Sequence, residues 1–317
     1  MADWMSKLPV AARERPLMNL AIPGSHHSGT CELNEESEIT MDQPWCVRAL
    51  TSNDTVRKAV YNWSKDQSLN ILQQLEAGIR YLDVTVVAAV DNIFVAHGLY
   101  CMPIRELLRK VDEFTTAHPK EVVLIDINRF YQFNEFQHAK LLELLDAVFG
   151  KKLISRPSSA QNILSYTLNK IWEDGGQVIV FYRPNKLVLP RKDKDNDATI
   201  SEPPQIPKYI WSNEFIRNPW PRTEEPEKMI EEVQEIFKKR NLDDGFQVCQ
   251  AIVTLTLNAV IRQPLGTFET RYARRTTRAL VRWLRKHGYE YRSNINIIST
   301  DFVDEEQFCE TVIDLNN

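Results

Sequence analysis

Short apolar runs rich in β-branched residues alternate along the chain with longer segments in which apolar positions recur every three or four residues. The short runs predict strands, and the longer periodic segments predict helices with one apolar face. The predicted strands cover residues 18–22, 80–86, 92–96, 121–127, 177–182, 247–253 and 295–299. The predicted helices cover residues 68–77, 104–117, 134–149, 222–239 and 268–287.

This alternation predicts an α/β fold with a mostly parallel sheet and crossover helices. The continuous apolar run over residues 122–125 is typical of a strand that is buried on both faces. Periodicity alone leaves both an open, doubly wound sheet and a closed barrel possible. A chain of 317 residues that is 43% hydrophobic can bury a large core, and single α/β barrels commonly reach this length. We therefore expect one domain over residues 1–317.

Composition narrows the class of protein. A net charge of −4 leaves no global positive field for nucleic acid. The five cysteines are scattered and lack zinc-site or disulfide spacing, so we expect free thiols in a reducing compartment. The N-terminus does not have the pattern of a secretory signal, and no run of eighteen apolar residues predicts a transmembrane segment. The expected location is cytoplasmic, with membranes met only peripherally.

Two segments place a histidine beside glycines just after an apolar run, at residues 22–30 (IPGSHHSGT) and 95–100 (VAHGLY). A single histidine is more often a hydrogen-bonded structural residue than a catalyst. Two that converge are the usual equipment of general acid-base catalysis near neutral pH. The pattern indicates a protein that cleaves a phosphodiester, or that descends from one that did.

Together with LEAGIRYLDV at residues 75–84, these two segments resemble the X domain of phosphatidylinositol-specific phospholipase C. The likeness is greatest to the small cytosolic X-domain-containing phospholipase C-like proteins, which have no accessory modules. Further landmarks follow in the expected order to the C-terminus, at residues 119–126 (PKEVVLID), 178–183 (VIVFYR), 211–220 (WSNEFIRNPW) and 296–302 (NIISTDF).

The resemblance selects a distorted TIM-type (βα) barrel, whose site lies at the C-terminal ends of the strands. His26, His97, Arg183 and Asp301 all follow predicted strands closely.

The resemblance also implies a phosphoric diester hydrolase that acts on phosphatidylinositol-type lipids at a membrane surface. His26 aligns with the base that takes the proton of the inositol 2-hydroxyl, and His97 with the acid that protonates the departing diacylglycerol oxygen. Asp301 resembles the carboxylate that orients the base. A plain N-cap of the following helix is an equally good interpretation of Asp301.

Other residues resemble the substrate pocket of the family. Arg183 matches the arginine that binds inositol hydroxyls, and Asn128 and Gln250 are weaker candidates for the same pocket. For Gln250, a hydrogen bond within the core is the simpler account.

Two positions depart from the family pattern. His27 stands where most relatives carry an acidic residue or asparagine, and Thr85 where bacterial enzymes carry a phosphate-stabilising arginine. Such an arginine can be worth about 10³ to 10⁵ in rate. Arg80 could replace it only if strand geometry allowed, and its odd spacing from Thr85 predicts the opposite face. Because adjacent residues in extended backbone point to opposite sides, His26 and His27 are not expected to share a role.

A calcium site of the eukaryotic type is not expected. Calcium takes six to eight oxygen ligands. Of the four aligned positions, His27, Asp83, Thr85 and Asn128, only Asp83 is a carboxylate. Asp83 is kept as a candidate catalytic residue, and no metal or other cofactor is predicted.

Two rival functions remain open. One is a catalytically weak or inactive relative that binds a phosphoinositide or a protein through the same pocket. The other is a glycerophosphodiester-type enzyme, which would need clustered glutamates, whereas Glu32, Glu35 and Glu36 lie in a polar loop without a matching set.

Two charged segments also allow two interpretations each. The arginine stripe of helix 268–287 is either a solvated barrel face or a surface for anionic lipid. The charged run at residues 191–197 (RKDKDND) lies in an irregular stretch over 184–219. It is either a solvated loop or a rim that meets phosphate headgroups.

Overall fold

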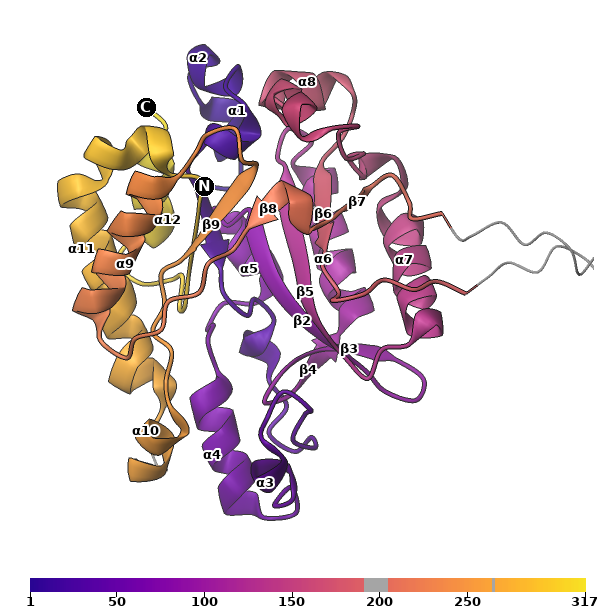
Figure 1. Cartoon of the computed structure of the whole chain (residues 1–317), viewed down its shortest axis with the longest axis vertical. Coiled ribbons are helices and arrows are strands. Elements are labelled where there is room, and N and C mark those ends of the chain that lie inside the picture. Colours follow the sequence, from indigo (N-terminus) through magenta and orange to yellow (C-terminus); the bar gives the residue numbers. More distant parts are fainter. Residues whose placement is uncertain (191–204, 264–265) are drawn as a thin grey trace, which may run out of the picture.

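A curled, mostly parallel sheet forms the centre of the molecule (Figure 1). The computed structural model describes residues 1–190, 205–263 and 266–317, and the run at 191–197 lies outside them. The sheet order is β7-β6-β5-β2-β1-β10-β9-β8, and β3 and β4 extend it from β2. The strands are β1 (Ile22–Ser25), β2 (Tyr81–Ala88), β3 (Ile93–His97), β4 (Leu99–Pro103), β5 (Val123–Tyr131), β6 (Val178–Tyr182), β7 (Ile210–Trp211), β8 (Ile216–Arg217), β9 (Phe246–Gln250) and β10 (Ile297–Thr300).

Every pairing along this path is parallel. The path ends at β7 on one side and at β8 on the other, and no ladder joins these two short strands within the described residues. The predicted α/β fold of distorted barrel type is thus confirmed.

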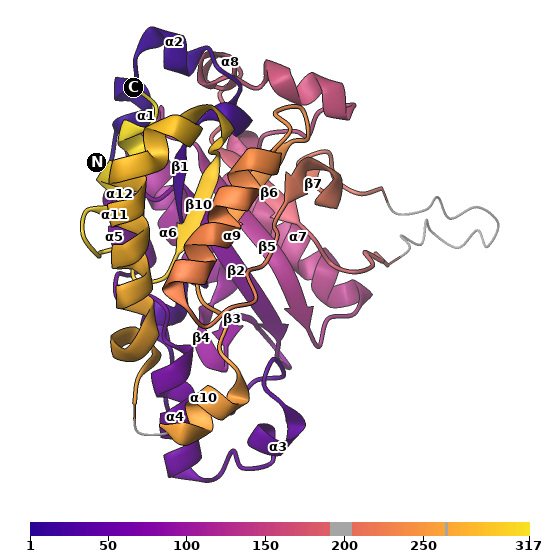
Figure 2. The same cartoon turned by 60° about the vertical axis from the view of Figure 1, so that its left-hand side comes forward.

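Helices cover the outer face of the sheet, as Figures 1 and 2 show from two sides. Helices α6 and α7 lie against β2, β5 and β6, while α9, α11 and α12 lie on the side of β9 and β10. The helices are α1 (Trp4–Lys7), α2 (Val10–Arg13), α3 (Trp45–Arg48), α4 (Asp54–Ser64), α5 (Ile71–Glu76), α6 (Ile104–Ala117), α7 (Glu135–Phe149), α8 (Leu168–Glu173), α9 (Pro226–Lys239), α10 (Leu257–Arg262), α11 (Arg274–Tyr291) and α12 (Phe308–Asp314). In both views α3, α4 and α10 lie beyond the C-terminal ends of the central strands, and α1, α2 and α8 lie at the opposite end.

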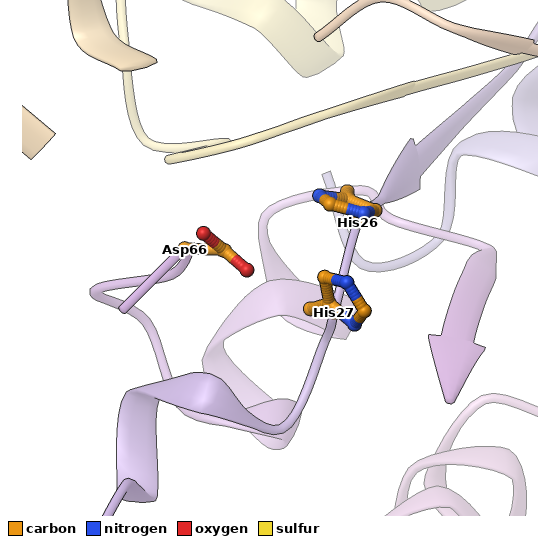
Figure 3. A group of neighbouring side chains, drawn as sticks. All are labelled: His26, His27 and Asp66. Atoms are coloured by element: carbon orange, nitrogen blue, oxygen red, sulfur yellow. The ribbon is translucent and has the colours of Figure 1, made fainter. Parts of the chain in front are cut away.

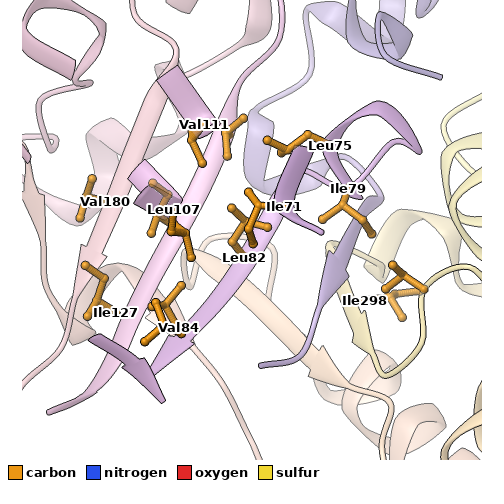
Figure 4. Packing of buried hydrophobic residues seen from close by; sticks show 14 of the residues in the cluster. Ile71, Leu75, Ile79, Leu82, Val84, Leu107, Val111, Ile127, Val180 and Ile298 are labelled. Carbon is orange, nitrogen blue, oxygen red and sulfur yellow. The ribbon is translucent and has the colours of Figure 1, made fainter. Parts of the chain in front are cut away.

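Strand β2 shows how the sheet separates core from site. Leu82 and Val84 are fully buried in the cluster that joins the sheet to α5 and α6 (Figure 4). Side chains alternate along a strand, so the residues between them face the other way. Tyr81 packs in the inner cluster, and Asp83 and Thr85 follow it toward the C-terminal end of the strand.

Most predicted elements are present, with α6 at the predicted bounds. The first predicted strand, 18–22, is wrong. Leu17–Asn19 forms a 3₁₀ turn, and the strand is Ile22–Ser25. Proline and glycine disfavour an isolated strand, but here hydrogen bonding to β10 and β2 on either side holds them in one. Strand β3 is antiparallel to β2 and β4, so it belongs to a hairpin and not to the parallel barrel.

The arginine stripe of α11 lies on a paired surface. Arg275 contacts Glu227 at 3.3 Å, Arg278 contacts Glu305 at 3.2 Å, and Arg282 contacts Glu306 at 3.1 Å. Neighbouring carboxylates therefore balance part of the stripe, which weakens its interpretation as a lipid-binding face. In the part of the chain that the structure describes, no helix is both long and apolar enough to cross a membrane.

Arg80 cannot stand in for the arginine missing at Thr85. Its guanidinium is fully buried and donates to Glu121 Oε2 at 2.9 and 2.7 Å and to the carbonyls of Leu75 and Ile79 at 2.7 Å. Burial raises the pKa of Glu121, and the charge of Arg80 opposes that rise. Because Arg80 precedes β2, this ion pair sits at the end of the sheet opposite to Thr85.

We predict that Glu121→Gln lowers the free energy of unfolding by about 3 to 5 kcal/mol, because it leaves the charge of Arg80 buried without its partner. The double variant Arg80→Met/Glu121→Met should lose less, since no charge is stranded. Urea unfolding followed by circular dichroism measures both. A single variant as stable as the wild type would contradict this role of the pair.

Candidate active site

His26 lies where β1 and β10, the first and last strands of the sheet in chain order, end side by side. Its backbone N–H donates to Thr300 O at 3.0 Å, and its Nδ1 lies 2.7 Å from Asp301 Oδ1. That hydrogen bond fixes the proton on Nδ1 and leaves the lone pair on Nε2. Nε2 is 4.0 Å from Asp83 Oδ2 and has no hydrogen-bond partner among the described residues. The N-cap interpretation of Asp301 is wrong, because the next helix begins only at Phe308.

His27 does not point away from His26, as extended backbone would require. Its φ of 40° is left-handed, and its ring centroid lies 3.9 Å from that of His26 and 3.8 Å from that of His97. The rings of His26 and His97 are therefore no more than about 8 Å apart. Burial, followed by the charges of His26 and His97, lowers the pKa of His27 well below its ordinary value. His27 is a neutral imidazole between the two histidines that were predicted to be catalytic.

Two carboxylates that were not predicted flank His97 at the end of β3. His97 Nδ1 lies 3.5 Å from Asp42 Oδ2, and His97 Nε2 lies 3.5 Å from Asp66 Oδ2. Burial raises the pKa of Asp42, but contact with His97 outweighs it and holds that pKa well below its usual range. Burial and the charges of Asp301 and Asp83 raise the pKa of Asp66 well above its usual range. The site thus offers His97 a firmly ionised carboxylate on its Nδ1 side.

Backbone contacts position Asp66. Its carbonyl accepts the N–H of Phe302 at 2.7 Å, and the side chain of the next residue, Gln67, donates to the carbonyls of His26 and Thr300 at 2.9 and 3.0 Å. The segment after α4 is therefore fastened across the ends of β1 and β10, which carries Asp66 into the site.

Asp83 accepts hydrogen bonds from the two amide side chains that were predicted to bind inositol. Asn128 Nδ2 donates to Asp83 Oδ1 at 2.5 Å, and Gln250 Nε2 lies 3.4 Å from Asp83 Oδ2. The one carboxylate of the calcium-type set is thus already bound by amide donors, and His27 and Thr85 add no carboxylate. These residues do not fit a calcium site of that type.

Arg183 is tied to a buried carboxylate. Its Nε and Nη2 donate to the two oxygens of Asp126 at 2.7 and 2.6 Å, and Tyr81 Oη donates to Asp126 as well, at 2.6 Å. Burial lowers the pKa of Arg183, but Asp126 outweighs it and raises the pKa. Arg183 and Asn128 line a hollow of about 410 Å³. Most of the charge of Arg183 is therefore already balanced.

Arg129 is the cation that sequence reasoning missed. A register shift that leaves Asn128 of β5 as the extra residue makes Arg129 the partner of Thr85, whose buried Oγ1 has no hydrogen-bond partner in the described parts of the chain. The exposed guanidinium lies 5.1 Å from the ring centroid of Trp220. The Trp220 ring is 5.3 Å from that of His26 and is fixed by a 2.8 Å bond to Thr254 Oγ1. Across the described ranges, no ion pair involves Arg129.

The glutamates of the polar loop are used elsewhere. Glu32 pairs with Lys110 at 2.7 Å, and Glu35 pairs with Lys58 at 2.8 Å. The glutamate cluster that a glycerophosphodiester-type enzyme would need is not formed by these residues.

We predict that His27 makes the protein less stable in acid. Since its folded pKa lies below the ordinary 6.5, the unfolded state binds the proton more tightly. The free energy of unfolding then falls by up to about 1.4 kcal/mol per pH unit below pH 6.5, until the folded pKa is reached. His27→Asn should remove this slope, because asparagine accepts left-handed backbone but does not titrate.

Urea unfolding of both proteins between about pH 5 and pH 7.5 measures the difference in slope. The contribution of Asp66 has the opposite sign and is common to both proteins, so it cancels in the difference. His287→Gln, a change in a half-exposed histidine of α11, serves as the control. Equal slopes for the wild type and His27→Asn would contradict a lowered pKa.

The chain is similar to known proteins along its whole length. The family model for "Phosphatidylinositol-specific phospholipase C, X domain" matches residues 41–183. The Homo sapiens PI-PLC X domain-containing protein 3 is 32% identical over 325 residues, which cover 100% of this chain and 94% of the relative. The Mus musculus PI-PLC X domain-containing protein 2 is 33% identical over 323 residues, covering 100% of this chain and 88% of the relative.

Solved structures share the fold. Phosphatidylinositol-specific phospholipase C from Listeria monocytogenes superposes with a TM-score of 0.63 at 17% identity, over 100% of this chain and 98% of its own. A phosphatidylinositol-specific phospholipase C from Staphylococcus aureus gives a TM-score of 0.66 at 18% identity, over 100% and 97%. The similarity to solved structures shows the fold alone, whereas the sequence similarity to the relatives also shows the family. The chain belongs to the family of PI-PLC X domain-containing proteins.

Proposed function

We propose that the protein is a phosphoric diester hydrolase that cleaves phosphatidylinositol-type lipids by attack of the inositol 2-hydroxyl on the phosphorus. The observation that carries the proposal is the pairing of two histidines with carboxylates in one small site. His26 bonds Asp301 and has a free Nε2, and His97 lies between Asp42 and Asp66. A base and an acid less than about 8 Å apart can serve the two oxygens of one phosphodiester.

In this reaction His26 Nε2 takes the proton of the 2-hydroxyl as its oxygen bonds to phosphorus. Asp301 stabilises the imidazolium that forms. The bond from phosphorus to the diacylglycerol oxygen breaks, and protonated His97 gives that oxygen its proton. Asp42 Oδ2 lies 3.5 Å from His97 Nδ1 and positions the ring for this transfer. The products are a cyclic inositol phosphate and diacylglycerol, and water can open the ring with the two roles reversed.

Arg129 supplies the positive charge that Thr85 lacks. It is the register partner of Thr85 on the next strand, it stacks on Trp220 at the edge of His26, and its charge is not already balanced by a carboxylate, unlike that of Arg183. Arg183, Asn128 and the 410 Å³ hollow beside them then form the headgroup pocket.

The protein binds its lipid substrate at a membrane surface. Large hydrophobic side chains are exposed on the segments beyond the C-terminal ends of the strands, where Met41 is 42%, Trp45 76%, Leu50 50% and Ile261 62% exposed. Apolar groups at the rim of a site can enter the interfacial region of a bilayer and bring the mouth to a headgroup.

A second function, binding of a phosphoinositide or a protein without turnover, is favoured by two features. Thr85 brings no charge to the position where bacterial enzymes carry arginine, and neutral His27 lies between the two histidines. Release of inositol phosphate from phosphatidylinositol vesicles by the purified protein separates the two functions.

We predict that His26→Ala and His97→Ala each lower turnover on these vesicles by about 10² to 10⁴, as expected for a base and an acid. His287→Gln, which changes a histidine of α11, should retain full turnover. Calcium chelation with EGTA should not lower the wild-type rate, because the calcium-type positions hold one carboxylate. Loss of turnover with EGTA, restored by calcium, would contradict the proposed chemistry, as would full turnover in either histidine variant.

We predict that Arg129→Gln lowers turnover by at least about tenfold, a small part of what a phosphate-stabilising arginine can contribute. Thr85→Arg should restore part of the loss in that variant, because it places a guanidinium on the adjacent strand. Arg222→Gln, which removes a charge from the loop that follows Trp220, is the matched control. If Arg129→Gln were as active as the control, another cation would have to stabilise the phosphate.

A further inference from the structure

Three buried side chains in the site face one another with donor atoms that make no hydrogen bond to any described residue, although Asp66 Oδ2 lies 3.5 Å from His97 Nε2. Donor atoms of His26, His27 and Asp66 lie within 4.8 Å of one another, and Figure 3 shows the Asp66 carboxylate pointing toward the two rings. His26 Nε2, His27 Nδ1 and Asp66 Oδ2 have no hydrogen-bond partner among the residues that the structure describes. All three residues are more than nine-tenths buried. Buried polar atoms without partners cost free energy. A ligand bound by all three atoms would offset that cost.

The donor set indicates the class of that ligand. Two imidazole nitrogens and one carboxylate oxygen suit zinc and its neighbours among the divalent transition metals, whereas calcium and magnesium prefer oxygen ligands. The left-handed backbone of His27 brings the adjacent rings to one side. In tetrahedral zinc sites the donor atoms are about 3.5 Å apart, so this set must close by about 1 Å.

The surroundings favour a cation as well. Asp301 accepts the Nδ1 proton of His26 at 2.7 Å, which is the carboxylate–histidine–metal arrangement that orients a ligand and raises its basicity. Asp83 Oδ2 lies 4.0 Å from His26 Nε2. A divalent ion would therefore meet three buried carboxylates, Asp66, Asp83 and Asp301, at short range.

We propose that His26 Nε2, His27 Nδ1 and Asp66 Oδ2 bind one divalent transition-metal ion of the zinc class, and that this ion blocks catalysis. The metal occupies the same lone pair that must take the proton of the inositol 2-hydroxyl, so metal and reacting phosphodiester exclude each other. The inhibition rests on the function proposed above, whereas the binding does not. The site would make the enzyme sensitive to free transition metal, and chelation would relieve that inhibition.

The binding test titrates the full-length, metal-free protein with Co²⁺, followed by visible absorption, and with Zn²⁺, followed by calorimetry. We expect one ion per chain and the absorption bands of low-symmetry, four-coordinate Co²⁺. His27→Asn and Asp66→Asn should each weaken Zn²⁺ binding by at least tenfold, since each removes one of three protein ligands. His287→Gln, the matched histidine control, should bind as the wild type does.

Circular dichroism checks that the variants are folded, and His27→Asn decides the test if Asp66→Asn does not fold. No stoichiometric binding, or binding by His27→Asn as tight as that of the wild type, would overturn the site. Equal loss in His287→Gln would also overturn it, by showing adventitious histidine binding.

The inhibition test measures release of inositol phosphate from phosphatidylinositol vesicles at increasing Zn²⁺. We expect turnover to fall with the same midpoint as Zn²⁺ binding, to recover with chelator, and to be at least tenfold less sensitive in His27→Asn. Turnover that is unchanged or raised when the site is full of Zn²⁺ would overturn the inhibition. A metal-free protein that binds Zn²⁺ as predicted but releases no inositol phosphate would refute the proposed function and leave the metal site standing.

Discussion

The site depends on the parallel pairing of β1 with β10. This pairing brings His26 beside Asp301, 275 positions away along the chain, and makes their 2.7 Å hydrogen bond possible. Gln67 fastens the ends of both strands by donating to the carbonyls of His26 and Thr300. Long-range strand pairing therefore sets the orientation of the His26 ring, and the segment after α4 brings Asp66 to the same place.

The charges in the site follow from burial. Carboxylates outnumber free cations around the three histidines. Burial raises the pKa of both Asp42 and Asp66, but for Asp42 the contact with His97 outweighs burial and lowers the pKa, whereas the pKa of Asp66 stays raised. Arg183 and Arg80 are each matched by a buried carboxylate. Arg129 is held instead by an aromatic ring at the mouth, where its charge remains available to an anion. In the proposed function, this distribution would let a site without arginine at position 85 attract a phosphodiester.

Much of this arrangement could be predicted from the sequence, because local patterns report local structure. Periodicity gave the bounds of α6, and the glycine-flanked histidine segments indicated both His26 and His97. Asp42 and Asp66 could not be found in this way, since they lie in irregular segments whose position depends on contacts with distant strands. The orientation of His27 was wrongly predicted because a single left-handed residue reverses the rule for extended backbone. The pairing of Arg129 with Thr85 depends on a bulge, which no periodic pattern shows.

The central claim is that the two histidine–carboxylate groups carry out attack by the inositol 2-hydroxyl. Phosphorus-31 NMR of the products formed from phosphatidylinositol vesicles tests it most directly, because a cyclic phosphodiester and an open phosphate monoester have separate resonances. The account predicts that the cyclic inositol phosphate appears first and that any open inositol phosphate forms later from it. Direct formation of the open phosphate without a cyclic precursor, or a product that retains phosphate on the diacylglycerol, would contradict it.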